Sequence, residues 1–254
     1  MHSLLLHLED VGVHFGALKA VDQVSFDLHE GERVAILGPN GAGKTTLFNA
    51  ITGISPATKG SIKLGADIIT KASPNRRAKL GIARTFQITN LFFGLTIEEN
   101  LLLATRGLQM SKFSPWRSNQ ANADERDVIH SALTRCQLDN KRQTLVKDIS
   151  YGEQRQLELA MSLTSSPKIL LLDEPAAGLS PAERGNMAEI IRSLPSDLAL
   201  ILIEHDIELA LGLVERVICM YQGSILVEGR PDEIRGNQQV QEIYLGKPRH
   251  VTSH

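Results

Sequence analysis

The sequence is poor in cysteine, in aromatic residues and in net charge. It has two cysteines and one tryptophan in 254 residues, 4% aromatic residues, and 27 basic against 29 acidic residues. Cys136 and Cys219 form no CxxC pair and have no histidine at metal-ligand spacing, so we expect core thiols in a reducing compartment. The formal net charge of −2 supplies no field that would recruit nucleic acid, and we expect no nucleic-acid partner.

Long hydrophobic runs are also missing. The longest aliphatic stretches, residues 198–203 and 169–172, have the length of strands and are far too short to span a membrane. Residues 3–8 are apolar, but no basic segment precedes them and they run into Glu9 and Asp10. We therefore interpret them as a first strand rather than a signal peptide, and we expect a cytoplasmic protein. The length suffices for the buried core of one large α/β domain or of a domain with a subdomain.

The strongest motif is a glycine-rich loop, Gly38-Pro39-Asn40-Gly41-Ala42-Gly43-Lys44-Thr45-Thr46, which matches G-x-x-x-x-G-K-[ST]. An apolar run at 32–37 predicts a buried strand before it, and residues 47–52 predict a helix after it. Glycines let backbone N–H groups converge on a phosphate, and the helix N-terminus adds partial positive charge. Lys44 is placed to reach the β- and γ-phosphates and the Thr45 hydroxyl to ligate Mg²⁺, so the loop predicts a nucleotide site.

Two acidic residues end a second buried strand. Residues 169–172 are aliphatic without alternation, as in a parallel strand covered on both faces, and Asp173, Glu174 and Pro175 follow. We expect Asp173 to hold Mg²⁺ through water and Glu174 to orient and deprotonate an attacking water. The plain alternative is an acidic turn at a strand end, but the phosphate loop upstream favours the catalytic interpretation.

Three more residues have two interpretations on position alone. Phe15 is either a ring that stacks on a purine or, as is usual for an aromatic, part of the core with Phe26. Gln87, at the end of a predicted strand at 82–86, either touches a metal or water or is a polar residue at a sheet edge. His205 follows the strand at 198–203 and either hydrogen-bonds a γ-phosphate or is structural.

The remaining chain divides into strands at its two ends and helices in the middle. Alternating stretches at 4–15 and 21–28 predict two antiparallel strands, followed by a short strand at 62–64. Residues 74–80 predict a short helix on which Arg76, Arg77 and Lys79 form a solvated basic face. A helix at 207–214, a hairpin of 216–221 with 224–227, and closing helices at 231–235 and 240–245 are expected after the last buried strand.

Capping boxes place the middle helices. Thr96 with Glu99, Asn122 with Glu125, and Ser150 with Glu153 each precede a helical pattern, so residues 88–165 predict a helical block inserted between strands. Ser180, Pro181 and Glu183 start another helix beyond the acidic strand.

In this order the motifs resemble those of the ATP-binding subunits of ABC transporters, along essentially the whole chain. That family has an adenine-stacking aromatic, a phosphate loop, a Gln loop, a signature segment, an acidic strand and a switch histidine. The matching positions are Phe15, residues 38–46, Gln87, residues 150–154, Asp173 with Glu174, and His205. The resemblance reverses the preference for the plain interpretation of Phe15, Gln87 and His205.

The resemblance implies one ABC ATPase domain of the α/β class. Its P-loop NTPase (RecA-like) core and N-terminal antiparallel β subdomain would take residues 1–87 and 166–254, with the helical signature subdomain at 88–165. It also implies that two such domains close head to tail on ATP and Mg²⁺. The Ser150 and Gly152 backbone and the helix that carries Glu153 would then face the γ-phosphate held by the partner. An ordinary capping box at Ser150 is compatible with this role.

Two departures from the commoner family pattern narrow the match. Tyr151 stands where the commoner signature has Gly, and Ser180 where many relatives have Asp, which leaves a contact across the dimer interface open. Tyr151 together with residues 84–87 and 173–179 resembles the ATPase subunits of branched-chain amino acid importers, whose close kin serve urea, amides and other amino acids. This implies membrane permease subunits, a second ATPase subunit (identical or a sister chain) and an extracytoplasmic substrate-binding protein as partners.

The same resemblance implies a place on the inner face of the membrane, with residues 87–99 and the helical block receiving the permease. One alternative is a soluble ABC ATPase that acts on DNA, ribosomes or cluster assembly, but such relatives usually carry a second ATPase domain or long insertions. Another is a regulator that binds nucleotide without turnover, which Lys44, Asp173, Glu174 and His205 argue against.

Overall fold

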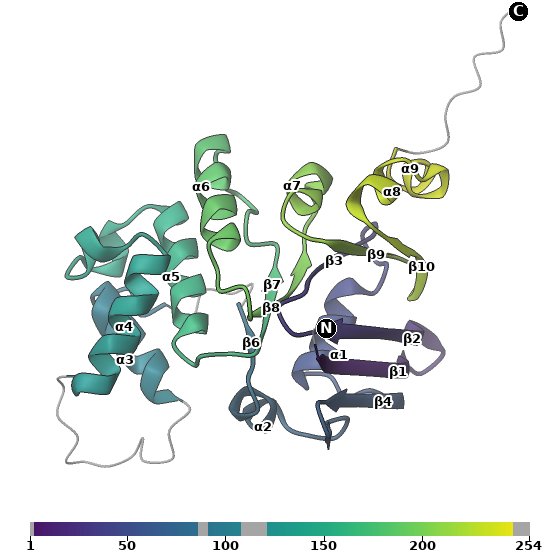
Figure 1. Cartoon of the computed structure of the whole chain (residues 1–254), viewed down its shortest axis with the longest axis horizontal. Helices are drawn as coiled ribbons and strands as arrows, with labels where there is room; N and C mark the ends of the chain where they lie inside the picture. Colours follow the sequence, from purple (N-terminus) through teal and green to yellow (C-terminus); the bar gives the residue numbers. More distant parts are fainter. Residues whose placement is uncertain (1–2, 86–90, 108–120, 246–254) are drawn as a thin grey trace, which may run out of the picture. The chain divides into compact units, whose positions relative to one another are not determined.

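The computed structural model describes residues 3–85, 91–107 and 121–245 (Figure 1). Two compact units are present, Met1–Lys71 with Ile201–His254, and Ala72–Leu200. The first unit contains the phosphate loop and His205, and the second contains the acidic strand end and the predicted signature segment.

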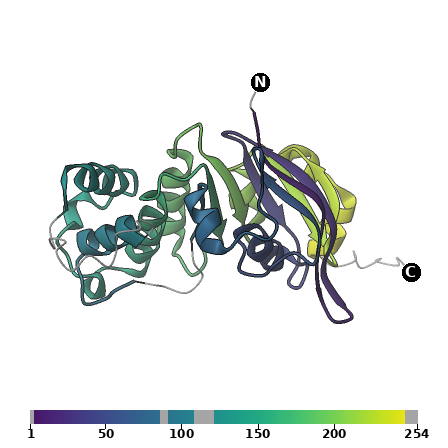
Figure 2. The ribbon, with the colours of Figure 1, turned by 90° about the horizontal axis from the view of Figure 1, so that it is seen from below.

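In the first unit, an antiparallel sheet precedes the phosphate loop. Its order is β2-β1-β4-β5. The strands are β1 (Leu4–Phe15), β2 (Leu18–His29), β4 (Lys59–Leu64) and β5 (Asp67–Ile68). Leu6 pairs with Leu28 and Leu8 with Phe26, and all four side chains are buried. The predicted antiparallel pair is confirmed, and Figure 2 shows it as a long purple ribbon.

The first unit also contains parallel strands, as expected for an α/β protein. β3 (Arg33–Leu37) pairs parallel with β9 (Arg216–Tyr221), which forms the predicted hairpin with β10 (Ser224–Gly229). Its helices are α1 (Lys44–Thr52), α7 (Ile207–Leu211), α8 (Pro231–Arg235) and α9 (Gln238–Leu245). The last four residues of β3 are buried, so the strand that delivers the phosphate loop lies in the core.

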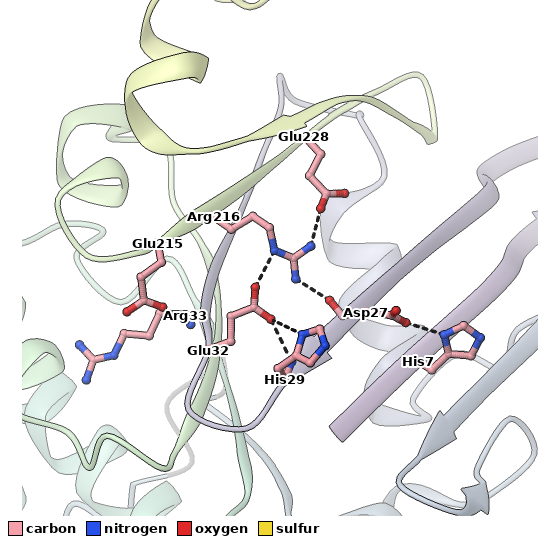
Figure 3. Close-up of polar contacts among 8 residues, drawn as sticks. All are labelled: His7, Asp27, His29, Glu32, Arg33, Glu215, Arg216 and Glu228. Carbon is pink, nitrogen blue, oxygen red and sulfur yellow. Dashed lines mark hydrogen bonds and ion pairs between the residues drawn. The ribbon is translucent and has the colours of Figure 1, made fainter. Parts of the chain in front are cut away.

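Arg216 ties the antiparallel sheet to the hairpin within this unit (Figure 3). Its Nε donates to Glu32 Oε1 at 2.6 Å, and its two other nitrogens donate to Glu228 and to the Asp27 carbonyl. Burial acts to raise the pKa of Glu32, but the hydrogen bond from Arg216 lowers it overall. Asp27 also contacts His7 of β1, so polar side chains connect β1, β2, β9 and β10.

The second unit combines two parallel strands with helices. β6 (Ile82–Arg84) pairs parallel with β7 (Ile169–Asp173), and all five residues of β7 are buried, as its unbroken aliphatic run predicts. β8 (Ala199–Ile203) spans the boundary of the two units. The α-helices are α2 (Pro74–Lys79), α3 (Ile97–Gly107), α4 (Ala123–Arg135), α5 (Tyr151–Leu163) and α6 (Pro181–Arg192), with 3₁₀ turns at Asp139–Lys141 and Val146–Asp148.

The predicted capping boxes are confirmed where the second unit's helices begin. The side-chain oxygens of Asn122, Ser150 and Ser180 each accept a hydrogen bond from the backbone amide of the glutamate three residues on. The backbone amide of each of the three residues donates in return to the carboxylate of that glutamate. Thr96 and Glu99 exchange the same bonds before α3. α3, α4 and α5 pack against one another around buried Leu101, Ile129 and Leu157. The predicted division of the domain at residues 88 and 165 stays a prediction.

The predicted basic face on α2 is wrong for one of its three residues. Arg76 and Lys79 are exposed, whereas Arg77 is 1% exposed and its Nε donates to the Ala72 carbonyl at 3.0 Å. A buried guanidinium is tolerated because its nitrogens find acceptors, and burial lowers the pKa of Arg77. The helix at residues 207–214 is also shorter than predicted and ends at Leu211.

The prediction of core thiols is confirmed. Cys136 and Cys219 are free and buried, and burial raises the pKa of Cys136 to about 12 and that of Cys219 to about 11. Neither thiol is therefore a reactive thiolate at neutral pH. Within the described ranges, no helix has the length and apolar character needed to cross a membrane.

Candidate nucleotide site

The phosphate loop follows β3 and leads into α1. At Gly38, with φ 157°, an added Cβ would lie 2.4 Å from the Met220 carbonyl oxygen. At Gly43, with φ 101°, it would lie 2.4 Å from the Ala20 carbonyl oxygen. The Gly223 amide donates to the Ala42 carbonyl at 3.0 Å, which holds the loop against the β9–β10 turn. Glycine is required at two loop positions because neighbouring backbone approaches so closely.

The N-terminus of α1 is prepared for an anion. Its N-cap is Gly43 in a left-handed conformation, no side chain caps it, and its first turn has no acidic residue. Lys44 is 6% exposed, and its Nζ donates to the carbonyls of Gly38 at 2.6 Å and Pro39 at 3.1 Å. The loop thus gathers a cation, a helix dipole and the exposed Thr45 side chain, the groups that bind phosphate and its metal.

The first unit also contains Phe15 and His205. Phe15 ends β1 and is 56% exposed, whereas Phe26 is 6% exposed. The interpretation of Phe15 as core is therefore wrong, because it lies beside the turn that joins β1 to β2, and its exposed ring is available to stack on a base. His205 is exposed after β8, and its amide donates to the carboxylate of buried Glu204 at 3.2 Å.

The acids lie in the second unit, at the end of β7. The Asp173 side chain is 0% exposed, and its Oδ2 accepts from Arg84 Nη2 at 2.6 Å. Glu174 is half-buried and has φ 51°, a left-handed conformation that costs a non-glycine residue about 1–3 kcal/mol. Such strain is concentrated at functional sites, so the backbone of Glu174 supports the special role that its position suggests.

The N-terminus of α5 differs from that of α1. The Ser150 amide donates to Glu153 at 2.9 Å, and Ser150 Oγ accepts from the Glu153 amide at 3.2 Å. Gly152 is buried against Glu183 of α6, so that an added Cβ would lie 2.4 Å from Glu183 Oε1. Hydrogen bonds from Ser180, with a smaller one from Gly152, lower the pKa of Glu183. A cavity of about 250 Å³ adjoins these residues.

Two residues at the site were not found from the sequence. Arg84 and Glu183 contact Asp173 and Gly152 from segments distant in the chain, and no local pattern signals such a contact. Glu183 was expected only as part of a capping box. Gln87, predicted to touch the metal, lies outside the described residues.

Each unit contributes one residue with chemistry suited to magnesium, Thr45 in the first and Asp173 in the second. The Thr45 hydroxyl and the Asp173 carboxylate are oxygen donors, which a hard cation prefers. No cluster of three or more His, Cys, Asp or Glu side chains suited to a metal occurs in the described parts of the chain. Magnesium is usually held by one or two protein oxygens together with substrate phosphates and water.

The chain is similar to known ATP-binding proteins of transporters. The ABC transporter family matches residues 21–177, and the branched-chain amino acid ATP-binding cassette transporter family matches residues 224–250. The chain is 38% identical to the high-affinity branched-chain amino acid transport ATP-binding protein LivG of Salmonella typhimurium, over 97% of this chain and 100% of that protein. It is 35% identical to BraF of Pseudomonas aeruginosa, a protein of the same description, over 96% and 98%.

A solved structure has the same fold. The ADP conformation of MJ1267, an ATP-binding cassette of an ABC transporter, matches with a TM-score of 0.86 and 28% identity over 96% of this chain and 100% of that one. The predicted fold class and the resemblance inferred from the motifs are thereby confirmed.

Proposed function

Because this chain belongs to the ABC transporter family of ATP-binding proteins, and is thus an ATPase, we propose that it drives an importer for branched-chain or other amino acids. The observation that carries the proposal is the likeness, over 97% of the chain, to a protein named for high-affinity branched-chain amino acid transport. The match of residues 224–250 to a branched-chain amino acid family supports it independently of the ATPase motifs.

In the proposed reaction the phosphate loop holds ATP. Backbone amides of residues 38–46, the α1 N-terminus and Lys44 bind the phosphates, and Phe15 stacks on the adenine. Glu174 takes a proton from a water whose oxygen attacks the γ-phosphorus, and the bond to the bridging oxygen of ADP breaks. His205 hydrogen-bonds the γ-phosphate. Thr45, Gln87 and Asp173 would hold Mg²⁺, which when bound neutralises charge on the phosphate oxygens.

The signature segment, residues 150–154, is proposed to form the contact between two ATPase subunits. Ser150, Gly152 and Glu153 stand at a helix N-terminus and complete the pocket of a second ATPase subunit, identical or a sister chain. ATP then joins the two subunits, and hydrolysis releases them. The transported molecule would touch only the membrane permease and an extracytoplasmic substrate-binding protein, so this chain would work on the cytoplasmic side, attached to the permease.

The proposal is tested first on the isolated chain. Wild type is expected to hydrolyse ATP in a magnesium-dependent manner. Glu174→Gln is expected to bind ATP, to associate into a stable dimer and to lose about 10²- to 10⁴-fold in turnover, the usual contribution of a general base. Glu189→Gln, which removes a carboxylate from the exposed side of α6, is the matched control and should hydrolyse normally. Near-normal turnover by Glu174→Gln would contradict the assigned role.

Its partners are tested by co-expression. The chain is expected to co-purify with the permease subunits encoded beside it and to show hydrolysis stimulated by the loaded substrate-binding protein. Importers of urea or amides are separated by which solute stimulates hydrolysis. Hydrolysis with no permease association would favour a soluble ABC ATPase, and nucleotide binding without turnover would favour a regulator.

A further inference from the structure

The carboxylate of Asp173 is held by an arginine from the neighbouring strand. Arg84 Nη2 lies 2.6 Å from Asp173 Oδ2, and the two side chains are 8% and 0% exposed. β6 and β7 run parallel, with Arg84 opposite Leu171, so the long arginine side chain reaches along the strand to the acid. Both residues belong to the second unit.

The residue that follows β6, Thr85, holds the backbone at the same place. Thr85 Oγ1 accepts from the Asp173 amide at 3.4 Å, and the Thr85 amide donates to the Leu171 carbonyl at 3.0 Å. Two consecutive residues, Arg84 and Thr85, therefore fix both the main chain and the side chain of Asp173.

A guanidinium suits this task better than an ammonium. Its planar array of donors sets the direction as well as the charge of a hydrogen-bonded carboxylate. Arg84 also lines a cavity of about 240 Å³, whose other residues are apolar Leu91, Ala104 and Met161 and polar Thr85, Glu158 and Ser162. Because both side chains of the Arg84–Asp173 pair are buried, water cannot readily replace the arginine, so the orientation of the carboxylate depends on Arg84.

We propose that Arg84 is a positioning residue that orients Asp173 for the magnesium ion of the ATPase reaction. The inference rests on the proposed function, in which Asp173 serves that ion. It assigns Arg84 a role through Asp173, without contact to nucleotide. Removing a partner that orients a metal ligand typically costs about 10- to 100-fold in metal affinity or activity.

The chain offers a matched control, because another arginine of the same unit, Arg106, pairs with a buried acid away from the site. Arg106 Nε and Nη2 donate to Glu125 at 2.8 and 2.9 Å, and their side chains are 17% and 3% exposed. This pair joins α3 to α4 and does not involve Asp173. Arg106→Met therefore removes a buried ion pair of similar kind while leaving Arg84 and Asp173 in place.

The experiment compares Arg84→Met, Arg84→Lys and Arg106→Met with wild type. It measures the magnesium concentration that half-saturates hydrolysis, the turnover, and the thermal shift produced by ATP with magnesium and by ATP with a chelator. In Arg84→Met, turnover should fall and the magnesium requirement rise by about tenfold, with the thermal shift by ATP in chelator unchanged. Arg84→Lys, which keeps the charge without the planar donors, should lie between. Arg106→Met should lose thermal stability without a changed magnesium requirement.

The two hypotheses fail differently. If wild type hydrolyses no ATP, the proposed function fails. If wild type hydrolyses ATP but Arg84→Met needs no more magnesium than Arg106→Met, Arg84 is merely structural and the inference is overturned. Should Arg84→Met not fold, Arg84→Lys decides, because a magnesium requirement equal to that of wild type in that variant overturns the inference as well.

Discussion

The N-termini of α1 and α5 are both proposed to face phosphate, yet the chain prepares them in different ways. α1 begins at a left-handed glycine, without a side-chain cap and without an acid in its first turn. α5 begins at a serine whose hydroxyl and neighbouring Glu153 satisfy backbone amides, and Glu183 lies against Gly152. The N-cap residue of α1 therefore offers no side-chain acceptor to the first amides, whereas those of α5 have acceptors from the same chain.

The difference follows from which molecule supplies the phosphate in the proposed mechanism. The α1 amides serve a nucleotide bound by their own chain, so a competing side-chain acceptor there would weaken binding. The α5 amides are proposed to bind a nucleotide that a second subunit holds. In the free subunit the side-chain caps give these amides hydrogen-bond partners. Side-chain caps stabilise such an end by about 0.5–2 kcal/mol. The comparison predicts that backbone changes dominate at α1 and that side-chain changes matter at α5.

The largest effect is expected at Gly43. In Gly43→Ala the new methyl group would lie 2.4 Å from the Ala20 carbonyl at φ 101°, so the loop must move. Because a displaced loop misplaces the groups that bind phosphate, we expect the affinity for ATP to fall by about 100-fold. Gly41→Ala is the control: its φ of 80° strains the backbone by about 1–2 kcal/mol, but the methyl group meets nothing within 4 Å. Equal ATP affinities of the two variants, by titration, would contradict this account.

A smaller effect, confined to turnover, is expected at Gly152. The methyl group of Gly152→Ala displaces the Glu183 carboxylate, which is flexible, while alanine improves helix propensity by about 1 kcal/mol. Thermal stability and ATP binding should change little, and turnover should fall by about tenfold because the methyl group sits at the N-terminus of α5, which is proposed to meet the partner's phosphate. Glu183→Ala alone removes the carboxylate without adding a methyl group and should retain turnover. Normal hydrolysis by Gly152→Ala would remove this glycine from the site.

Local patterns predicted what local physics determines. The spacing of serine and glutamate specified where α5 and α6 begin, and the aliphatic run specified β7, because caps and burial depend on residues close in sequence. Position alone favoured a buried Phe15, which only the family resemblance reversed, and the burial of Arg77 was missed, since each depends on how a strand or helix packs against its neighbours.

The contacts of the site were beyond the reach of local patterns. Arg84 and Asp173 are 89 residues apart, and their pairing depends on β6 lying beside β7. A capping box predicted the role of Glu183 toward Ser180 but not its position against Gly152, which depends on α6 packing beside α5. The family resemblance predicted which motifs form the site, whereas the residues that position these motifs, Arg84 and Glu183, were found only in the structure.

The smallest effect expected is a pH dependence of stability that comes from the carboxylates at the starts of α5 and α6, Glu153 and Glu183. Burial acts to raise the pKa of Glu153, but hydrogen bonds, first from Lys141, lower it below the usual 4.5, and the pKa of Glu183 is lowered as well. A carboxylate with a lowered folded-state pKa contributes stability above its unfolded pKa and loses it as pH falls through the folded value. The melting temperature of wild type should therefore fall more steeply from about pH 5 to pH 3 than that of the double variant Glu153→Gln/Glu183→Gln. Parallel slopes for the two proteins, with Glu189→Gln as control, would show that these two carboxylates do not stabilise the starts of α5 and α6.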